Sequence, residues 1–222
     1  MDEIITKIAV YALPILFAIT LHEAAHGYAA RHFGDDTAAK LGRLSLNPVN
    51  HIDPFGTIVL PLVMFIISKI GGGFFLFGYA KPVPVDFGKL RNPKRDMIWV
   101  AFAGPAANYV MAVFWTILAV LFTKFQMHKF FVEMAEAGIA INLVFFALNM
   151  FPLPPLDGGR VLVGLLPTKQ AISVARMEPY GIFVVMLLAM TPLFYRYWIG
   201  PVAYVLGQPL DFIAQVLQSS LN

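Results

Sequence analysis

The sequence predicts an all-α polytopic membrane protein with about 5–6 transmembrane helices and a short membrane-associated β-strand or hairpin over residues 74–87. Hydrophobic residues make up 59% of the 222 residues and charged residues only 13%, which is too little polar material for a soluble surface. Several stretches also lack Asp, Glu, Lys and Arg over about the length that crosses a bilayer. These stretches are residues 8–21, 54–68, 97–123, 137–156 and 179–195.

The first helix is expected over residues 4–30, with a bend near Pro14. Its charge-free part is too short to span a bilayer unless the helix continues through the sequence HEAAH at residues 22–26. That continuation places three polar side chains inside the apolar layer, where they are costly to bury. Such residues within a membrane segment indicate a functional site.

The second apolar segment, residues 54–70, is just long enough to cross the membrane and equally suits a re-entrant segment. In the stretch that follows, aromatic and β-branched residues alternate with Lys and Pro, which favours a strand. Pro82 and Pro84 are two residues apart and remove donors from one edge of that strand. The other edge is expected to be free to pair with another chain. It is the edge served by Lys81, Val83 and Val85.

The rest of the chain is expected to be helical, without a repeat or an appended domain. The C-terminal twenty residues are interpreted as amphipathic or interfacial. We treat residues 1–222 as one domain with a core of about 4–166 and C-terminal helices over 179–219. The expected helices cover residues 96–122 and 131–150, a short segment after Gly159, and residues 180–195.

The basic residues indicate an orientation. Loops 31–53, 81–95 and 160–176 hold eleven of the sixteen Lys and Arg, so the positive-inside rule places them in the cytosol and the N-terminus outside. This requires residues 54–85 to cross the membrane twice or not at all. The net charge of +3 resides in short loops and does not indicate a nucleic-acid partner. The expected surroundings are the lipid bilayer of the cell membrane.

Two histidines and a glutamate suggest a metal site in the first helix. His22 and His26 are four residues apart, so their imidazoles share a helix face, and Glu23 lies beside them within reach of a water on a bound metal. At about 1.5 Å rise per residue, His22 is roughly 22 Å from Lys7 and about 13 Å from Arg31. The cluster is therefore expected inside the apolar layer. The alternative, simple pairing with other helices, buries these groups at a higher cost.

A third metal ligand is expected at Asp157. One helix supplies two ligands with good geometry, whereas a catalytic zinc takes three, and the chain contains no cysteine. Pro152, Pro154 and Pro155 end regular helix before the membrane surface, and irregular backbone at that depth needs a protein-lined or wet site. The alternative is that Asp157 only caps the next helix.

The two motifs together resemble the site-2 protease family of intramembrane zinc metalloproteases, peptidase family M50. HEAAH is followed by NMFPLPPLDGG at residues 149–159, and AGPAANY at residues 103–109 is similar to the third-segment signature of that family. The resemblance extends over residues 21–160, and the chain looks like a minimal form without an inserted PDZ or nucleotide-sensing domain.

The resemblance implies roles for individual residues. His22, His26 and Asp157 are implied to bind one Zn²⁺ per chain. Glu23 is implied to be the general base, and Asn149 is implied to stabilise the oxyanion or orient the substrate. The enzyme would hydrolyse peptide bonds of transmembrane substrate helices near the cytosolic side of the membrane.

Substrate binding is expected at the strand edge of Lys81, Val83 and Val85, where an unwound substrate can pair with the main chain. The alternative is a loop that only plugs the site. Asn142, seven residues before Asn149, is interpreted as a substrate contact or as structural support. Two other classes of function stay open, a membrane metal transporter and a non-proteolytic protein that binds membrane helices. The sequence determines neither the natural substrate nor the oligomeric state.

Overall fold

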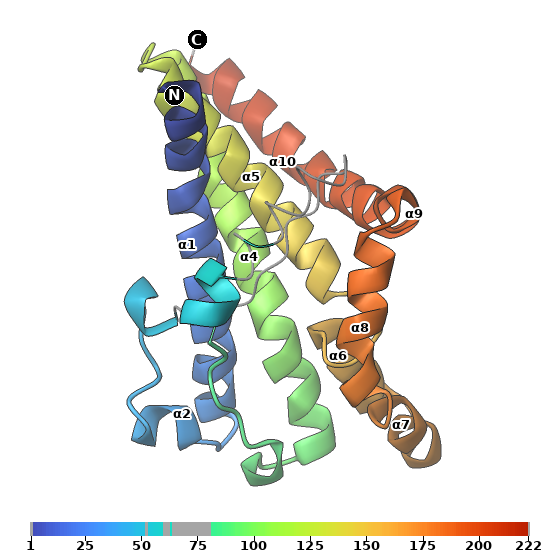
Figure 1. Ribbon diagram of the computed structural model, residues 1–222. Coiled ribbons are helices and arrows are strands. Elements are labelled where there is room, and N and C mark those ends of the chain that lie inside the picture. Colours follow the sequence, from blue (N-terminus) through green and yellow to red (C-terminus); the bar gives the residue numbers. More distant parts are fainter. Residues whose placement is uncertain (1, 52, 60–62, 64–80, 222) are drawn as a thin grey trace.

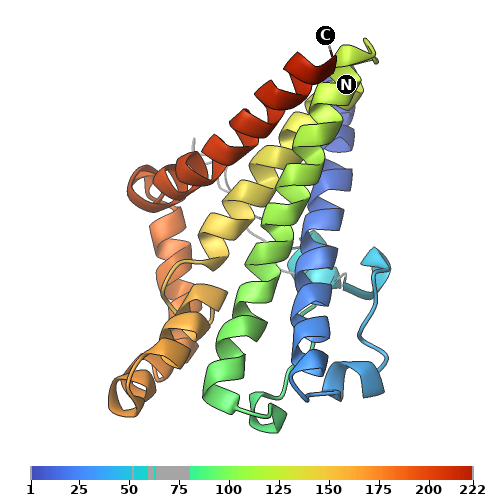
Figure 2. The same cartoon turned by 180° about the vertical axis from the view of Figure 1, so that it is seen from behind.

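Three long helices form the centre of the computed structural model, which describes residues 2–51, 53–59, 63 and 81–221 (Figure 1). They are α1 (Asp2–His32), α4 (Pro93–Lys124) and α5 (Lys129–Asn149), and each packs against the other two. Successive helices run in opposite directions along the bundle. The same bundle is seen from behind in Figure 2.

The described residues contain three helices long and apolar enough to cross a membrane, which agrees with the expected multi-pass membrane protein. The number rises to four if the bent pair α7 (Thr168–Ala175) and α8 (Glu178–Ala189), which meet at 62°, forms one span. The expectation of about 5–6 spans is therefore supported only in this coarser form. It depended in part on the second apolar segment, most of which lies outside the described residues.

The C-terminal region departs from the predicted continuous helix over residues 180–195. Helix α8 ends at Ala189, because Thr191 is extended ahead of a proline and α9 (Pro192–Phe194) starts anew. A π-helical turn, η4 (Tyr195–Ile199), leads into α10 (Gly200–Leu221).

Helix α10 returns along the bundle and packs on α4 and α5 (Figure 2). Its buried Leu210 contacts Ala112 and Leu143. Just before α10, the indole nitrogen of Trp198 donates a hydrogen bond of 2.7 Å to the carbonyl oxygen of Ala147. The expected interfacial segment is thus anchored along the bundle.

The loops rich in Lys and Arg gather at one end of the bundle, opposite the two chain termini (Figure 1). Their short elements are α2 (Thr37–Lys40), η3 (Phe87–Lys89), and α6 (Asp157–Leu165) with α7 on the other side. The elements η1 (Pro48–His51) and η2 (Pro54–Val59) lie part-way along the bundle (Figure 1).

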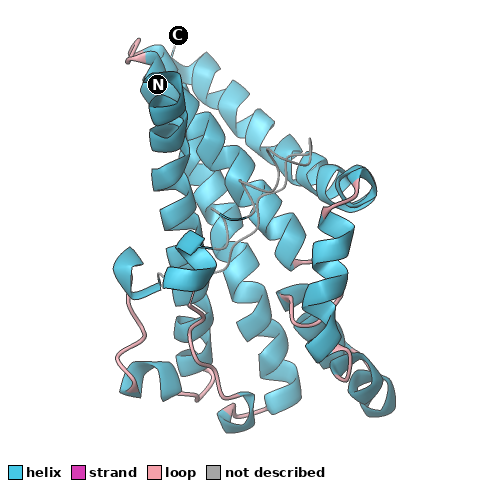
Figure 3. Cartoon of the chain, in the orientation of Figure 1, coloured by secondary structure: helices cyan, strands magenta, loops and turns pink. Residues whose placement is uncertain are grey.

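The predicted strand is not found in the described part of the chain, which contains no strand (Figure 3). Residues 81–86 form a loop. The physical reason is that the N–H groups around the prolines find partners other than a neighbouring strand: Lys81 N–H donates to the His51 carbonyl, and Val83 and Asp86 donate to carboxylates. Residues 74–80 of that prediction lie outside the described residues.

Candidate metal centre

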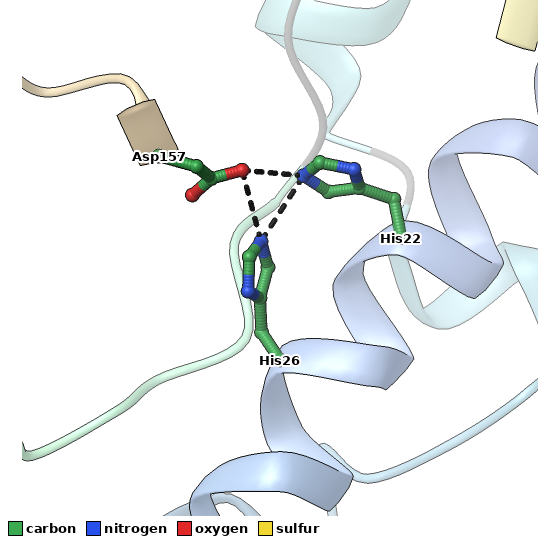
Figure 4. Close-up of side chains that lie close together, drawn as sticks. All are labelled: His22, His26 and Asp157. Carbon is green, nitrogen blue, oxygen red and sulfur yellow. Dashed lines mark hydrogen bonds and ion pairs between the residues drawn. The ribbon is translucent and has the colours of Figure 1, made fainter. Parts of the chain in front are cut away.

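His22, His26 and Asp157 converge on one point (Figure 4). The Nε2 atoms of His22 and His26 are 3.1 Å apart. Oδ2 of Asp157 lies 3.1 Å from Nε2 of His22 and 3.3 Å from Nε2 of His26. The helical spacing puts both imidazoles on one face of α1, and the start of α6 supplies the carboxylate from across the bundle.

Asp157 reaches the histidines because the chain turns sharply between α5 and α6. Two glycines that follow it lie against this turn. A Cβ atom on Gly158 would lie 2.3 Å from the Met150 carbonyl oxygen, and one on Gly159 would lie 2.1 Å from the Pro154 nitrogen. Only glycine fits such a close approach. The piece of chain that these two glycines admit is the proline-rich turn itself.

Gly104 of α4 lies against the two imidazoles. A Cβ atom at this position would lie 2.4 Å from Nε2 of His26 and 2.6 Å from Cε1 of His22. The lack of a side chain at Gly104 lets α4 pack closely on α1. The structure places the contact at the metal-binding edge of the histidines, so a side chain here would collide with the ligand atoms themselves.

Each histidine has a partner for its other ring nitrogen. Nδ1 of His26 lies 2.7 Å from the Val100 carbonyl oxygen, which can only accept, so this nitrogen carries the proton. Nδ1 of His22 lies 2.6 Å from Oδ1 of Asn108. Val100 gave no signal in the sequence, because its contribution is a backbone atom. Asn108 lies in the AGPAANY sequence at residues 103–109.

The cluster fits a metal ion. With the protons on Nδ1, both Nε2 atoms present lone pairs, and the buried Oδ2 of Asp157 has no hydrogen-bond donor in the described structure. Three acceptors that face one another repel unless a positive charge lies among them. Zinc bonds of about 2.0–2.2 Å in a tetrahedron give ligand separations of about 3.3–3.6 Å, slightly longer than the 3.1–3.3 Å observed here.

Glu23 lies on the same helix outside this triad, in contact with the loop of residues 81–86. Its Oε2 accepts a hydrogen bond of 2.8 Å from the backbone N–H of Val83. The side chain of Val83 is buried over Gly27, where an added Cβ would lie 2.9 Å from Val83 Cγ1. Glu23 and Gly27 are one helical turn apart, so the loop lies along the face of α1 that carries the proposed base.

The loop is anchored at both ends. Near its start, Lys81 is exposed and its N–H donates to the His51 carbonyl oxygen at 2.9 Å. Val85 is partly buried and packs in the apolar cluster of Ala30. At its end, the N–H of Asp86 donates to Oδ2 of Asp35 at 2.7 Å.

Asp35 is a buried carboxylate that holds this end of the loop, with 1% of its surface exposed. Its Oδ1 accepts hydrogen bonds from the N–H and the hydroxyl of Thr37. Burial by itself raises the pKa of Asp35, but the hydrogen bonds from Thr37 and Asp86 outweigh it and hold the pKa below its ordinary value.

The two predicted asparagines lie apart from the metal ligands. Asn149 is the last residue of α5, and its Nδ2 donates to the Phe145 carbonyl oxygen at 3.0 Å. Asn142 is fully buried and bonds to Asn108 and to the Gly138 carbonyl oxygen. Its position agrees with the alternative of structural support for the site.

A triad of two imidazoles on a helix of membrane-spanning length and one carboxylate, in which His26 is partly buried and the other two residues are buried, is typical of membrane metalloproteases when a glutamate lies beside it. Comparison with known proteins leads to the same class. The model of Peptidase family M50 matches residues 10–137, more than half of the chain. The chain therefore belongs to peptidase family M50, as a site-2 protease-like zinc metalloprotease.

Among curated proteins, the chain is similar to YwhC of Bacillus subtilis, which is named as a candidate zinc metalloprotease. The two are 38% identical over 192 residues, which cover 82% of this chain and 80% of YwhC. Proteins of the same class named Rip2 are 28% identical in Mycolicibacterium smegmatis, over 82% of this chain and 67% of Rip2, and 27% identical in Mycobacterium tuberculosis, over 86% and 70%. No solved structure matches the chain.

Proposed function

We propose that this protein is an intramembrane zinc protease that hydrolyses peptide bonds of transmembrane substrate helices near the cytosolic side. The observation that carries the proposal is the convergence of three buried acceptor atoms at 3.1–3.3 Å on helices of membrane-spanning length, with Glu23 on the same helix. A site of this kind inside the apolar layer is costly unless it serves a function.

In this proposal His22, His26 and Asp157 hold the zinc ion. When bound, zinc acts as a Lewis acid that polarises a peptide carbonyl and acidifies water. The match to the family model ends at residue 137, so the assignment of Asp157 rests on its distances to the two histidines.

Glu23 is the proposed general base. Its Oε2 takes a proton from the attacking water and then delivers it to the amine nitrogen of the leaving strand. In the present structure that oxygen accepts the N–H of Val83, and release of this hydrogen bond would leave both carboxylate oxygens of Glu23 open to the water.

The loop of residues 81–85 is the proposed substrate-binding element. A substrate helix must lose its internal hydrogen bonds near the cut, and an extended chain beside Glu23 can replace them. Lys81, Val83 and Val85 are the residues assigned to this contact. Release of the Val83 N–H from Glu23 would make one main-chain donor available to the substrate while it frees the base.

Asn149 is proposed to stabilise the oxyanion or to orient the substrate. Its Nδ2 donates to the Phe145 carbonyl oxygen of its own helix, so the amide has to turn away from that carbonyl to reach a substrate. The position of Asn149 at the end of α5, just before the turn that leads to Asp157, supports this assignment.

The proposed cut lies toward the cytosol because the loops richest in Lys and Arg share one end of the bundle. His22 and His26 lie nearer the C-terminal end of α1, which is the same end (Figure 1). The positive-inside rule assigns that end to the cytosol and the N-terminus to the outside.

The test is reconstitution of the purified protein in liposomes with a single-span model substrate, with Glu23→Gln as the variant. We expect cleavage to fall by about 10²- to 10⁴-fold, the usual contribution of a general base, with bound zinc unchanged. Cleavage that survives the substitution would remove Glu23 as the base. Zinc flux into the liposomes without any cleavage by either protein would instead indicate a metal transporter, and substrate capture without either activity would indicate a binding protein.

A further inference from the structure

The two metal-binding imidazoles are oriented in different ways. Nδ1 of His26 faces a backbone carbonyl, an acceptor that no side-chain substitution removes. Nδ1 of His22 faces the side-chain amide of Asn108, which can present either an acceptor or a donor depending on how it is turned. The tautomer of His22 therefore depends on what fixes that amide.

A chain of hydrogen bonds fixes it. Nδ2 of Asn142 lies 2.8 Å from the Gly138 carbonyl oxygen, which can only accept, so Oδ1 of Asn142 is directed toward Asn108. That oxygen accepts from Nδ2 of Asn108 at 3.0 Å, and the same Nδ2 also donates to the Ala18 carbonyl oxygen at 3.2 Å. Oδ1 of Asn108 is left to face His22, so Nδ1 of His22 must be the donor.

The surroundings allow no easy alternative. Asn108 and Asn142 are both fully buried, so water cannot replace a lost partner. Turning the amide of Asn108 would set its oxygen against the Ala18 carbonyl oxygen and against Oδ1 of Asn142, which leaves acceptors unpaired in an apolar interior. The network joins α1, α4 and α5.

We propose that Asn108 and Asn142 are positioning residues that hold His22 with its proton on Nδ1 and so keep its Nε2 lone pair directed at the metal. This inference rests on the proposed function, since it assigns these amides a role toward the metal site. Partners of this kind typically change metal affinity by about 10- to 100-fold.

Two readouts test the inference in the full-length protein in detergent. The first is zinc affinity, measured by competition with a chelator. We expect Asn108→Leu to weaken binding by about 10- to 100-fold. Asn108→Asp, whose carboxyl still offers an acceptor oxygen to Nδ1 of His22, should retain most of the affinity. The matched control is Thr116→Val, which removes a buried hydroxyl from the same helix that bonds only to the Ala112 carbonyl oxygen.

The second readout is ¹⁵N NMR of histidine-labelled, metal-free protein at alkaline pH, with His22 assigned among the five histidines by substitution. We expect the Nδ1–H tautomer in the wild type and a mixture of tautomers in Asn108→Leu and, to a smaller extent, in Asn142→Leu.

The results separate the two proposals. The positioning role would be overturned if His22 of the wild type carried its proton on Nε2. It would also be overturned if the variants Asn108→Leu and Thr116→Val bound zinc equally well. Equal losses in Asn108→Leu and Asn108→Asp with an unchanged tautomer would also overturn it and indicate a packing role. A failure of the proposed function would give a different result: the wild-type protein would have the expected His22 tautomer but would bind no zinc.

Discussion

The metal ligands lie among tightly packed helices, whereas the proposed base Glu23 is contacted by a loop. Around His22 and His26 the neighbours are a glycine that leaves no space, a backbone carbonyl and two buried amides. Among the described residues, Glu23 receives one hydrogen bond, from the N–H of Val83, which lies in a loop without helix or strand.

This difference agrees with the demands of the two tasks. Metal ligands need fixed geometry, and close-packed interiors resist displacement by even a methyl group. A general base that must reach a large substrate needs an adjacent loop that can move away from it. Three predictions test this difference between the metal ligands and Glu23, in order of the expected effect on the site.

The largest effect is expected from Gly104→Ala. The added Cβ would lie 2.4 Å from Nε2 of His26, so the ligand atom itself has to move, and we expect zinc affinity to fall by about 100-fold or more. Chelator competition measures it. The control is Gly207→Ala in α10, where an added Cβ meets nothing within 4 Å. Equal zinc binding by the two variants would mean that the metal half of the site is not rigid.

The second prediction concerns Val83→Pro, which removes the N–H that contacts Glu23. If the loop pairs with substrate, cleavage should fall by about 2- to 10-fold, the value of one main-chain hydrogen bond to the substrate, while zinc content stays the same. Val83→Ala keeps the N–H and serves as the control. Cleavage that rises in Val83→Pro and stays constant in Val83→Ala would show that the loop only covers the base.

The smallest effect on the site is expected from Asp35→Asn, which weakens the anchor of the loop. An amide nitrogen would face backbone donors, so we expect about 1–3 kcal/mol less stability at neutral pH, measured by thermal unfolding in detergent. Because the folded pKa of Asp35 is below its ordinary value, its charged form stabilises the protein above about pH 4. That stabilisation disappears as the pH falls through the folded pKa, so the difference from wild type should shrink in acid.

Asp36→Asn is the matched control for the anchor. Asp36 also has a lowered pKa, caused first by its hydrogen bond with Lys40, but it lies at the surface, where an ion pair contributes little. A destabilisation by Asp36→Asn as large as that by Asp35→Asn would show that the loop is not held by the buried carboxylate.

Most of the metal site could be predicted from the sequence because its signals are local. The spacing of His22 and His26 acts through helical periodicity, and the prolines before Asp157 act through backbone sterics. Both rules hold wherever the helix lies. The positions of the Val100 carbonyl and of Gly104 against the imidazoles depend on how α4 packs against α1. No local sequence pattern determines how these two helices are aligned with one another.

The predicted strand shows the opposite case. Alternating residues around Pro82 and Pro84 satisfy a local rule for a strand edge, yet strand pairing needs a partner elsewhere in the fold. In the described residues the N–H groups of Lys81, Val83 and Asp86 bond to one carbonyl and two carboxylates instead. Propensity describes which backbone shapes are possible, and tertiary contacts select among them.

The sequence alone determined that this is a membrane protein with two imidazoles on one helix face and a carboxylate after a proline-broken segment, because hydropathy, periodicity and proline act along the chain. Only the tertiary structure decided which atoms face one another: that Oδ2 of Asp157 meets both Nε2 atoms, that Asn108 faces His22, and that Val83 contacts Glu23. These contacts join residues far apart in the chain, and their distances follow from the packing of whole helices.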